Sequence, residues 1–420
     1  MNYRLYSWLS RASLPLAFGR LMWRSRNQPA YRQRWPERLG FGRVSAPGGI
    51  WLHAVSVGEV NAALPLLTSL RKTYPALPVL VTTTTPTGSA QLRQRLGHTV
   101  AHCYLPYDLP GAVRRFLDRV QPRLGIVMET ELWPNLFAAA TNANIPLVLA
   151  NARLSQRSSR GYRRLAGLTR QTLGQLSAVG AQTSADAQRL IELGLPQSRL
   201  NITGNIKFDA PVADTAPGLA LRQRLGPKRP VWLAASTHAG EEAAALAAHR
   251  VLRQAQPGAA LILAPRHPQR FPEIARLCHE QGWVTSLRSA DDDTWCDVYL
   301  ADSMGELPSL MAAADLVFVG GSLVARGGHN LIEPAQLGKP TLFGPHMHNF
   351  AELRDITLAA GAGLQVVDAP NLALQLTTLM ADAPRRARMG EAAQALVATH
   401  RGATARTLAL IAPYLETPPG

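Results

Sequence analysis

Two glutamates in this sequence stand where a carboxylate could act on a bound hydroxyl group. Glu59 belongs to "HAVSVGEV" (53–60), in which a buried-strand pattern ends and a helical pattern over 61–71 follows. Glu59 therefore falls at a strand-to-helix turn, where backbone N–H groups point outward. Such a carboxylate either starts the helix or acts as a general base within about 3 Å of its target. Because the helix terminus favours the ionised form of the carboxylate, we expect Glu59 to act as a proton acceptor.

The second glutamate, Glu129, lies in "METELWPNL" (128–136), together with Glu131. The two carboxylates point to the same side if the chain is extended. Glu129 is nearer the end of a predicted strand and is the better candidate for a ligand cleft, whereas Glu131 is a candidate cap for a helix beginning near Leu132. Lys207, in "GNIKFD" (204–209), is a lone lysine of the kind that is normally solvated, so only its neighbourhood favours a role.

The stretch "GGSLVARGGHNLIEPAQLGKP" (320–340) is typical of a nucleotide site. Glycine pairs allow close approach of the backbone and expose N–H groups to anions. Glu333 is suited to accept hydrogen bonds from both hydroxyls of a ribose. The alternative is structural, with Asn330 capping a helix and Glu333 completing a capping box.

Two further segments offer phosphate or nucleotide contacts. Arg266, at the tip of the predicted strand in "LILAPRHPQRF" (261–271), is suited to a bidentate grip on phosphate, or is simply an exposed loop arginine. In "DSMGELPSL" (302–310), Ser303 and Glu306 form another possible capping box, and the backbone amides there could equally contact a nucleotide.

Short apolar runs that alternate with helical patterns must position these residues. Continuous Val, Ile, Leu and Ala runs separated by helices predict parallel sheets covered on both faces. The predicted strands are 79–85, 124–130, 146–152 and 176–183, then 230–237, 258–266, 295–302 and 314–322, with helices over 86–96, 109–120 and 132–143.

The two series of strands predict two doubly wound α/β domains facing a cleft, separated by the Pro- and Ala-rich stretch 210–230. Ligands of such sheets bind beyond the carboxyl ends of the strands. This rule places the candidate residues around one crevice: Glu59, Thr82 to Thr85, Glu129, Asn151, Arg266 and Gly320 to Ser322.

Composition indicates a globular protein whose positive charge is unevenly distributed. The chain has 420 residues, 46% of them hydrophobic, and a formal net charge of +16. Residues 1–50 hold nine arginines and one acid, Glu37, and a second cluster extends over 153–170. Such clusters attract the phosphates of nucleic acid, anionic lipid or a phosphorylated substrate. The three separated cysteines suit a reducing compartment and lack paired metal spacing.

The N-terminal segment favours a membrane surface among these partners. Arg4, Arg11 and Arg20 interrupt its apolar residues, whereas a membrane span needs about 20 mostly apolar residues. The apolar residues follow helical spacing and the arginines lie on another face, as in a helix at the membrane interface. An ordinary amphipathic helix that covers a core is the alternative. The basic run 20–43 favours the membrane surface, with the bulk of the protein cytoplasmic.

Taken together, these motifs closely resemble those of the 3-deoxy-D-manno-octulosonic acid (Kdo) transferases, from about residue 20 to 400. The resemblance rests on "PAYRQRWPERLGFG", "HAVSVGEV", "TTTTPTGS", "YLPYDLP", "METELWPNL", "LANARLS", "GNIKFD", "PRHPQRF", "MGEL" and "GGSLVARGGHNLIEPA". It implies the two-domain GT-B fold and inverting, metal-independent transfer of Kdo from CMP-Kdo to a lipid A precursor (lipid IVA). This step belongs to lipopolysaccharide synthesis on the cytoplasmic side of the inner membrane.

The resemblance also implies a domain plan and residue roles. The expected parts are a membrane-docking helix and basic segment (1–48), an acceptor domain (49–209), a junction (210–229) and a donor domain (230–420). Glu59 is implied as the general base, with Glu129 and Lys207 stabilising the transition state. The implied CMP contacts are Pro265, Arg266, Met304, Gly305, Glu306, Asn330, Leu331, Ile332 and Glu333.

A phosphate leaving group needs compensating cations rather than a proton donor, and Arg266 and Lys207 can supply them. The expected partners are CMP-Kdo, a lipid A precursor and an anionic lipid surface, without nucleic acid, metal or other cofactor. The arginines assigned to acceptor or membrane contacts are Arg153, Arg157, Arg160 and Arg163.

Three alternative functions remain open from the residues. A different glycosyltransferase or a nucleotide-sugar epimerase could use the same architecture, because a fold does not fix a function. A hydrolase could pair Glu59 with Glu129. A non-catalytic protein that binds membranes or nucleic acid would explain the charge but leave Glu59, Lys207 and Arg266 without a role.

Overall fold

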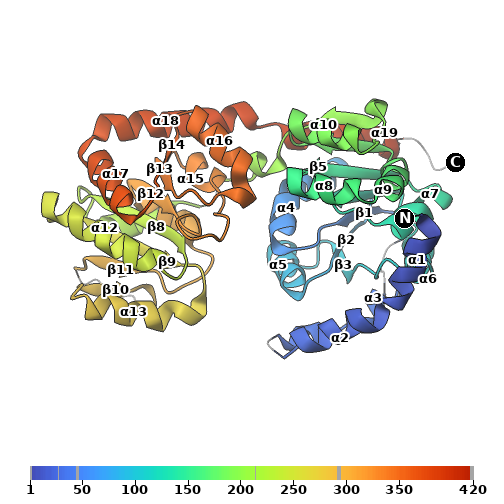
Figure 1. Cartoon of the computed structure of the whole chain (residues 1–420), viewed down its shortest axis with the longest axis horizontal. Coiled ribbons are helices and arrows are strands. Elements are labelled where there is room, and N and C mark those ends of the chain that lie inside the picture. Colours follow the sequence, from blue (N-terminus) through green and yellow to red (C-terminus); the bar gives the residue numbers. More distant parts are fainter. Residues whose placement is uncertain (1, 27, 44–46, 213, 291–294, 417–420) are drawn as a thin grey trace. The chain divides into compact units, whose positions relative to one another are not determined.

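The computed structural model describes residues 2–26, 28–43, 47–212, 214–290 and 295–416, which form two compact units (Figure 1). Unit 1 comprises the described residues up to Ala210 together with those from His400 onward, and unit 2 comprises those from Pro211 to Thr399.

Unit 1 contains a sheet of seven parallel strands in the order β3-β2-β1-β4-β5-β6-β7. The order reverses beside β1, so the residues that follow β1 and β4 lie at the position where doubly wound sheets bind ligands. The strands are β1 (Ile50–His53), β2 (Val79–Thr83), β3 (Ala101–Tyr104), β4 (Leu124–Met128), β5 (Leu147–Ala152), β6 (Ala178–Ala181) and β7 (Leu200–Ile202).

Helices cover both faces of this sheet, and alternate strand residues feed two separate cores. Ile50 and Leu52 point into one core, whereas Trp51 points into the other. The helices are α1 (Tyr3–Ala12), α2 (Leu14–Arg24), η1 (Pro29–Arg32), α3 (Trp35–Arg38), α4 (Val57–Thr73), α5 (Pro86–Leu96), α6 (Pro110–Val120), α7 (Pro134–Asn142), α8 (Gln156–Arg163), α9 (Ala166–Leu173), α10 (Ser184–Glu192), η2 (Gln197–Arg199), η3 (Ile206–Asp209) and α19 (Ala403–Glu416).

Unit 2 contains a second sheet of seven parallel strands, in the order β10-β11-β9-β8-β12-β13-β14. This order reverses beside β8, between β9 and β12. The strands are β8 (Val231–Thr237), β9 (Ala260–Pro265), β10 (Thr285–Leu287), β11 (Val298–Leu300), β12 (Leu316–Val319), β13 (Thr341–Phe343) and β14 (Gly363–Gln365).

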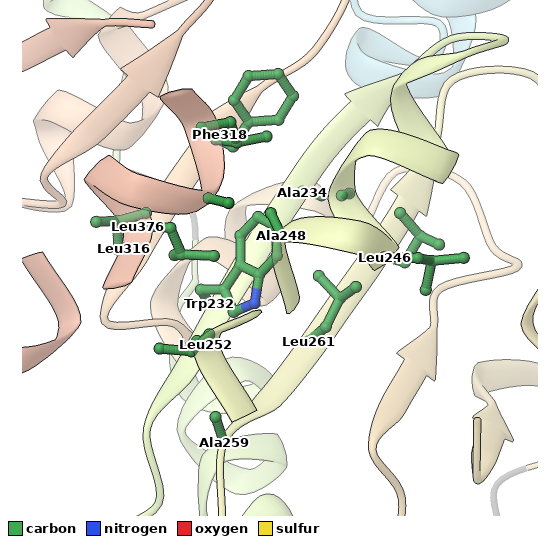
Figure 2. Close-up of a cluster of buried hydrophobic side chains, with 14 of the residues drawn as sticks. Trp232, Ala234, Leu246, Ala248, Leu252, Ala259, Leu261, Leu316, Phe318 and Leu376 are labelled. Atoms are coloured by element: carbon green, nitrogen blue, oxygen red, sulfur yellow. The ribbon is translucent and has the colours of Figure 1, made fainter. Parts of the chain in front are cut away.

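One core of unit 2 surrounds Trp232, which is fully buried between strand and helix side chains (Figure 2). Leu252 comes from α12, Phe318 from β12 and Leu376 from α17. The helices of the unit are α11 (Ala216–Leu225), α12 (Glu241–Ala255), η4 (Pro268–Arg270), α13 (Phe271–Glu280), η5 (Arg288–Ala290), α14 (Leu307–Ala313), α15 (Ile332–Gln336), η6 (His348–Phe350), α16 (Ala351–Ala359), α17 (Ala369–Ala381) and α18 (Ala383–His400).

The C-terminal helix differs from the predicted domain plan, which assigns 230–420 to one domain. The chain returns to unit 1 from His400 onward, and α19 buries Ile411 and Leu415 in a core of that unit. Tyr414 on this helix donates a hydrogen bond to the carbonyl of Ser177 (3.2 Å). The apolar face of α19 is thus explained by the sheet of unit 1.

Candidate active site

Glu59 lies in the first turn of α4, directly after β1. Its Oε2 accepts a hydrogen bond from Val55 N–H (2.7 Å), and its Oε1 lies 3.3 Å from Ser56 Oγ. The carboxylate thus bends back over the turn that leads into its own helix, and it is half-buried there. The sequence placed this residue correctly at a strand-to-helix turn.

The prediction that Glu59 is ionised in the free protein is wrong. Burial raises the pKa of Glu59 to about 8, and the negative charges of Glu129 and Glu131 add to that effect. The hydrogen bonds from Val55 and Ser56 act in the opposite direction but do not compensate. Because desolvation outweighs the helix terminus, the carboxyl is largely protonated at neutral pH in the free protein.

Glu129 and Lys207 come together in the same unit. Glu129 follows β4 with φ +55°, a left-handed conformation that costs a non-glycine residue energy and is frequent at functional sites. Lys207 Nζ lies 3.0 Å from Glu129 Oε1, and each side chain keeps about a quarter of its surface exposed. Since Glu129 also acts on the pKa of Glu59, the three predicted catalytic residues share one neighbourhood.

Lys207 is held in place by a short, heavily bonded segment, η3. Asn205 Oδ1 accepts from Lys207 N–H (3.0 Å), and Asn151 Oδ1 accepts from Ile206 N–H (3.0 Å). At the end of the segment, Asp209 accepts hydrogen bonds from Gly402 N–H (2.7 Å) and from the N–H of Thr404, which begin the approach to α19. The position of the ammonium group therefore depends on residues far apart in the sequence.

Glu131 is not the helix cap that the sequence suggested. Helix α7 begins at Pro134, and Asp108 accepts hydrogen bonds from Asn135 N–H (3.0 Å) and Leu136 N–H (2.8 Å). Burial and the charge of Glu129 raise the pKa of Glu131 to about 7. Glu131 therefore lies close enough to Glu59 and Glu129 for their charges to interact, a neighbourhood that the sequence analysis did not predict for it.

In unit 2 the predicted donor residues lie at the carboxyl end of the sheet. Pro265 ends β9, and the exposed Arg266 follows it, with its N–H bonded to Thr237 O (2.9 Å). Met304 is 54% exposed and Gly305 has φ +87°. These residues belong to the loops that follow β9 and β11.

Glu306 does not form the expected capping box. It is itself the N-cap residue of α14 and makes no side-chain bond to the helix backbone. Its carboxylate instead accepts a hydrogen bond from Ser303 Oγ and pairs with Arg288 (3.1 Å). The bond from Ser303 and the charge of Arg288 lower the pKa of Glu306.

The segment from Asn330 to Glu333 also departs from a capping box, because the N-cap of α15 is Leu331. Asn330 Oδ1 accepts from Ile332 N–H (3.1 Å), and Asn330 Nδ2 donates to Glu333 Oε1 (3.1 Å). Burial raises the pKa of Glu333. Leu331 and Ile332 are buried at 2% exposure, so only Asn330 and Glu333 present polar groups.

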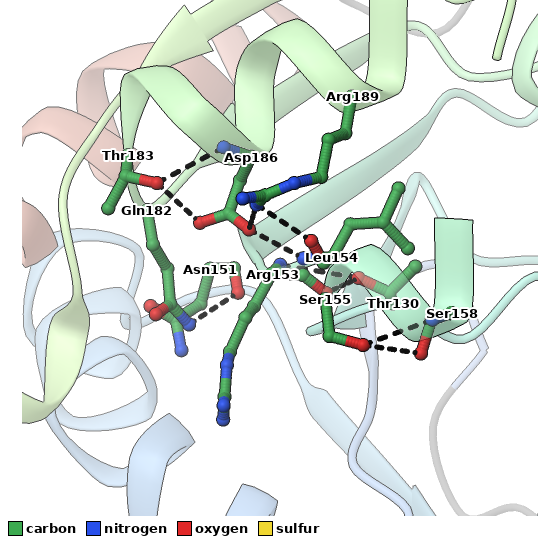
Figure 3. Close-up of polar contacts among 10 residues, drawn as sticks. All are labelled: Thr130, Asn151, Arg153, Leu154, Ser155, Ser158, Gln182, Thr183, Asp186 and Arg189. Carbon is green, nitrogen blue, oxygen red and sulfur yellow. Dashed lines mark hydrogen bonds and ion pairs between the residues drawn. The ribbon is translucent and has the colours of Figure 1, made fainter. Parts of the chain in front are cut away.

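The four arginines assigned to acceptor contacts come from the end of β5 and from α8. Thr130 Oγ1 bonds to the backbone N–H of Arg153 (3.2 Å), and Leu154 N–H bonds to Asp186 (2.7 Å), which fixes the end of β5. The half-buried Arg153 side chain points away from Asp186 and Arg189 (Figure 3). The other three arginines lie on α8: Arg157, Arg160 and Arg163.

The basic segment 20–43 is likewise not all solvated surface. Arg38 is only 3% exposed, stacks 4.4 Å from the Tyr104 ring centroid and donates to Thr84 O (3.0 Å). Arg34 pairs with Glu37 (2.7 Å). Arg38 thus attaches the segment to the rest of unit 1, and Arg34 is paired within the segment, so neither arginine is fully available to bind lipid phosphates.

The N-terminal helices contact the rest of unit 1 through both polar and apolar side chains. On α1, Tyr6 OH donates to Asp108 (2.8 Å) and Ser7 Oγ to Asn135 (2.6 Å), whereas α2 buries Leu21 and packs Phe18 against Trp35 with ring centroids 5.0 Å apart. In the described part of the chain no helix is long and apolar enough to cross a membrane. The exposed apolar side chains of α1 and α2 are Leu5, Trp8, Leu9, Leu16, Met22 and Trp23.

Sequence reasoning missed a cluster at the end of β8, where His238 contacts His329 and where Glu241 is fully buried. The signal was present as "STHAGEE" (236–242), in which polar residues follow a buried strand and precede a helix. In the described residues, no three His, Cys, Asp or Glu side chains are grouped so that they could hold a metal ion.

Comparison with known proteins shows which family this chain resembles. Residues 33–210 match the family model described as 3-deoxy-D-manno-octulosonic-acid transferase (kdotransferase). A 3-deoxy-D-manno-octulosonic acid transferase of Haemophilus influenzae is 43% identical, with 92% of this chain and 93% of the relative covered. The transferase of the same name from Bordetella pertussis is 39% identical over 99% of this chain and 100% of the relative.

Among solved structures, the UDP-GlcNAc 2-epimerase of Neisseria meningitidis matches 87% of this chain and 100% of its own, with a TM-score of 0.61 and 16% identity. This likeness concerns the fold alone and agrees with the predicted GT-B architecture of two doubly wound domains. Because the two bacterial transferases match nearly end to end, the chain belongs to the family of 3-deoxy-D-manno-octulosonic acid (Kdo) transferases.

Proposed function

We propose that this protein transfers Kdo from CMP-Kdo to a lipid A precursor, lipid IVA, and releases CMP in lipopolysaccharide synthesis. The observation that carries the proposal is the grouping of Glu59, Glu129 and Lys207 at the carboxyl edge of one sheet in a chain of this family. The names of the relatives supply the sugar, and the chemistry of the residues supplies the roles.

In the proposed reaction Glu59, once ionised, takes the proton of an acceptor hydroxyl as its oxygen attacks the anomeric carbon. The bond from that carbon to the phosphate oxygen breaks, and its electron pair leaves with CMP. Attack from the face opposite the leaving group makes the transfer inverting. Arg266 and Lys207 are cations that compensate the negative charge developing on the leaving phosphate. The proposed transfer therefore needs no metal ion.

We further propose that α1 and α2 rest on the anionic lipid of the inner membrane, on its cytoplasmic side. Their outward face carries Trp8, Leu16 and Trp23, which are 64%, 77% and 67% exposed. Tryptophan is favoured at membrane interfaces, and such helices bind through their apolar face together with nearby basic residues. Arg157 and Arg160 on α8 remain candidates for contacts with lipid phosphates.

Mass spectrometry of lipid IVA after incubation with the protein and a CMP-Kdo-generating system tests the reaction. Wild-type protein should add one or more Kdo units, also after EDTA treatment once the donor is made. Glu59→Ala should abolish the shift, and Glu280→Ala, which changes an exposed glutamate of α13, should leave it unchanged. A wild-type protein that adds no mass from intact donor would overturn the proposed function.

A further inference from the structure

Two histidines of unit 2 meet at the point where the strand order of its sheet reverses. His238 follows β8 and His329 lies in the loop after β12, with their Nε2 atoms 3.1 Å apart and their ring planes within 8° of parallel. His267, which follows β9, packs edge-on against His238 at 5.1 Å between ring centroids. Loops at this position of an open α/β sheet are the usual ligand-binding loops.

The two rings lie against a glycine. Gly321 has φ +65°, and a Cβ atom there would stand 3.1 Å from His329 Nε2 and 3.4 Å from His238 Cδ2. The hydrogen bond from Gly328 N–H to Gly321 O (2.7 Å) folds the loop back and brings His329 over this position. A side chain at Gly321 would therefore displace the pair.

One buried carboxylate fixes both loops. Glu241 is fully buried, and its Oε2 accepts hydrogen bonds from His238 N–H (2.9 Å) and Gly321 N–H (2.6 Å). Its Oε1 accepts from Ser322 N–H (3.0 Å) and Leu323 N–H (2.9 Å). The pair is thus held on a rigid support, as a recognition site requires.

The surroundings of the pair are cationic. Arg266 and Arg326 both act on His238, and the opposing carboxylate of Glu241 is already bonded to four backbone N–H groups. Burial and these neighbours lower the pKa of His238, and burial, His238 and Arg266 lower the pKa of His329 to about 4. The contact between the two Nε2 atoms uses one N–H of the two neutral rings, and the N–H that remains lies among cations, where it is suited to bind an anionic oxygen group.

We propose that His238 and His329 bind an anionic oxygen group of the sugar-nucleotide donor, either the carboxylate of the transferred sugar acid or the phosphate of the nucleotide. This inference rests on the proposed function. A carboxylate distinguishes a sugar acid from neutral sugars, so in that case the pair determines which sugar is transferred.

Steady-state kinetics of full-length variants tests the pair. His238→Leu and His329→Leu should raise KM for CMP-Kdo at least about tenfold, with a smaller change in kcat, because a hydrogen bond to a charged group is lost. His329→Gln keeps an N–H donor and should recover most of the loss. His279→Leu, at an exposed position on α13, is the matched control and should behave as wild type.

Inhibition by CMP identifies the bound group. If the leucine variants keep the wild-type inhibition constant for CMP, the pair binds the sugar carboxylate, and if that constant rises with KM, the pair binds the phosphate. Unchanged KM and unchanged CMP inhibition in both leucine variants would overturn the inference, while transfer by the wild type would leave the proposed function intact.

A binding measurement that needs no catalytic turnover distinguishes failure of the proposed function from failure of the histidine-pair inference. Imidazole ¹⁵N resonances of His238 and His329, assigned with the variants, should shift in wild-type protein on addition of CMP or of free Kdo in the presence of CMP. A wild type without transferase activity whose signals still shift would overturn the proposed function and support the pair as an anion site. Signals that move with neither anion would overturn the pair.

Discussion

At the scale of single residues, the main finding is that burial raises the pKa of Glu59, the proposed general base, well above its ordinary value. Glu59 is half-buried among like charges, so its pKa of about 8 reflects desolvation reinforced by Glu129 and Glu131. A base with a pKa near the working pH holds a transferred proton readily and still ionises without a large cost. Only the ionised form can accept the proton of the hydroxyl group, so activity should depend on pH in this range.

We therefore expect kcat/KM to rise with pH, with the midpoint of the rise near pH 8 and a plateau above it, as Glu59 loses its proton. Glu131→Gln removes one repelling charge and should move the rising limb to lower pH. The pH dependence of initial rates with a stable lipid acceptor measures both. A limb near pH 5 in the wild type would contradict the protonated state inferred for Glu59.

The same shift predicts a stability change. The folded protein holds a proton on Glu59 between the ordinary pKa of 4.5 and about 8, whereas the unfolded chain releases it. The contribution of this proton to the free energy of unfolding is complete below the pKa of Glu59 in the unfolded chain. It is lost as the pH rises through the pKa in the folded protein, so the free energy of unfolding falls with increasing pH. Glu59→Gln should be more stable than wild type at pH 8 and similar at pH 4. Urea unfolding at the two pH values, with Glu280→Gln as control, measures the difference.

The sequence could predict those properties of the site that depend on neighbouring residues in the chain, and not those that depend on residues far away in the sequence. The position of Glu59 depends on neighbouring residues and was predicted correctly. Its protonation depends on burial and on Glu129 and Glu131, which a local pattern does not contain. Glu131 was predicted to cap a helix. Asp108, which lies in another part of the chain, accepts the hydrogen bonds from the first N–H groups of that helix instead.

At the scale of elements, prediction succeeded where a cap or a long apolar run marks the chain. Helix α5 begins at Pro86, after Thr85 whose side chain accepts from Gly88 N–H, and ends at Leu96 as predicted. Strands β3, β7, β10, β13 and β14 were missed because they have only three or four residues, too few to show a period. Strand β11 is equally short but lies inside the predicted strand 295–302. Their pairing partners rather than their own sequences define them.

The segment η3 links Lys207, which is proposed to stabilise the transition state, to α19, and we expect Asp209 to act as a positioning residue. Asp209→Asn should weaken the bonds to Gly402 and Thr404, reduce stability by about 1–3 kcal/mol and lower kcat by displacing Lys207. Asp382→Asn removes a comparable bond to Arg385 N–H in unit 2 and should affect stability but not kcat. Thermal unfolding and transfer rates of both variants test this, and equal kcat values would contradict the role of Asp209.

At the scale of the whole molecule, the N-terminal helices α1 and α2 leave six large apolar side chains exposed, and these form the surface proposed to rest on a membrane. Trp8→Ser and Trp23→Ser should each weaken binding to vesicles of anionic phospholipid by about tenfold, since a buried aromatic side chain is worth about 1.5–3 kcal/mol. Co-sedimentation with vesicles measures the binding. Trp295→Ser changes an exposed tryptophan of unit 2, and a loss as large as that of Trp8→Ser would refute a specific surface.

The return of the chain to unit 1 has a consequence for how the protein is made. A ribosome completes the sheet of unit 1 long before it has synthesised Ile411 and Leu415, the α19 side chains that enter the core beside that sheet. Domains generally fold as units during synthesis, the N-terminal one first. Here unit 2 interrupts unit 1, so the first domain to emerge acquires the last part of its core only after unit 2 has been synthesised.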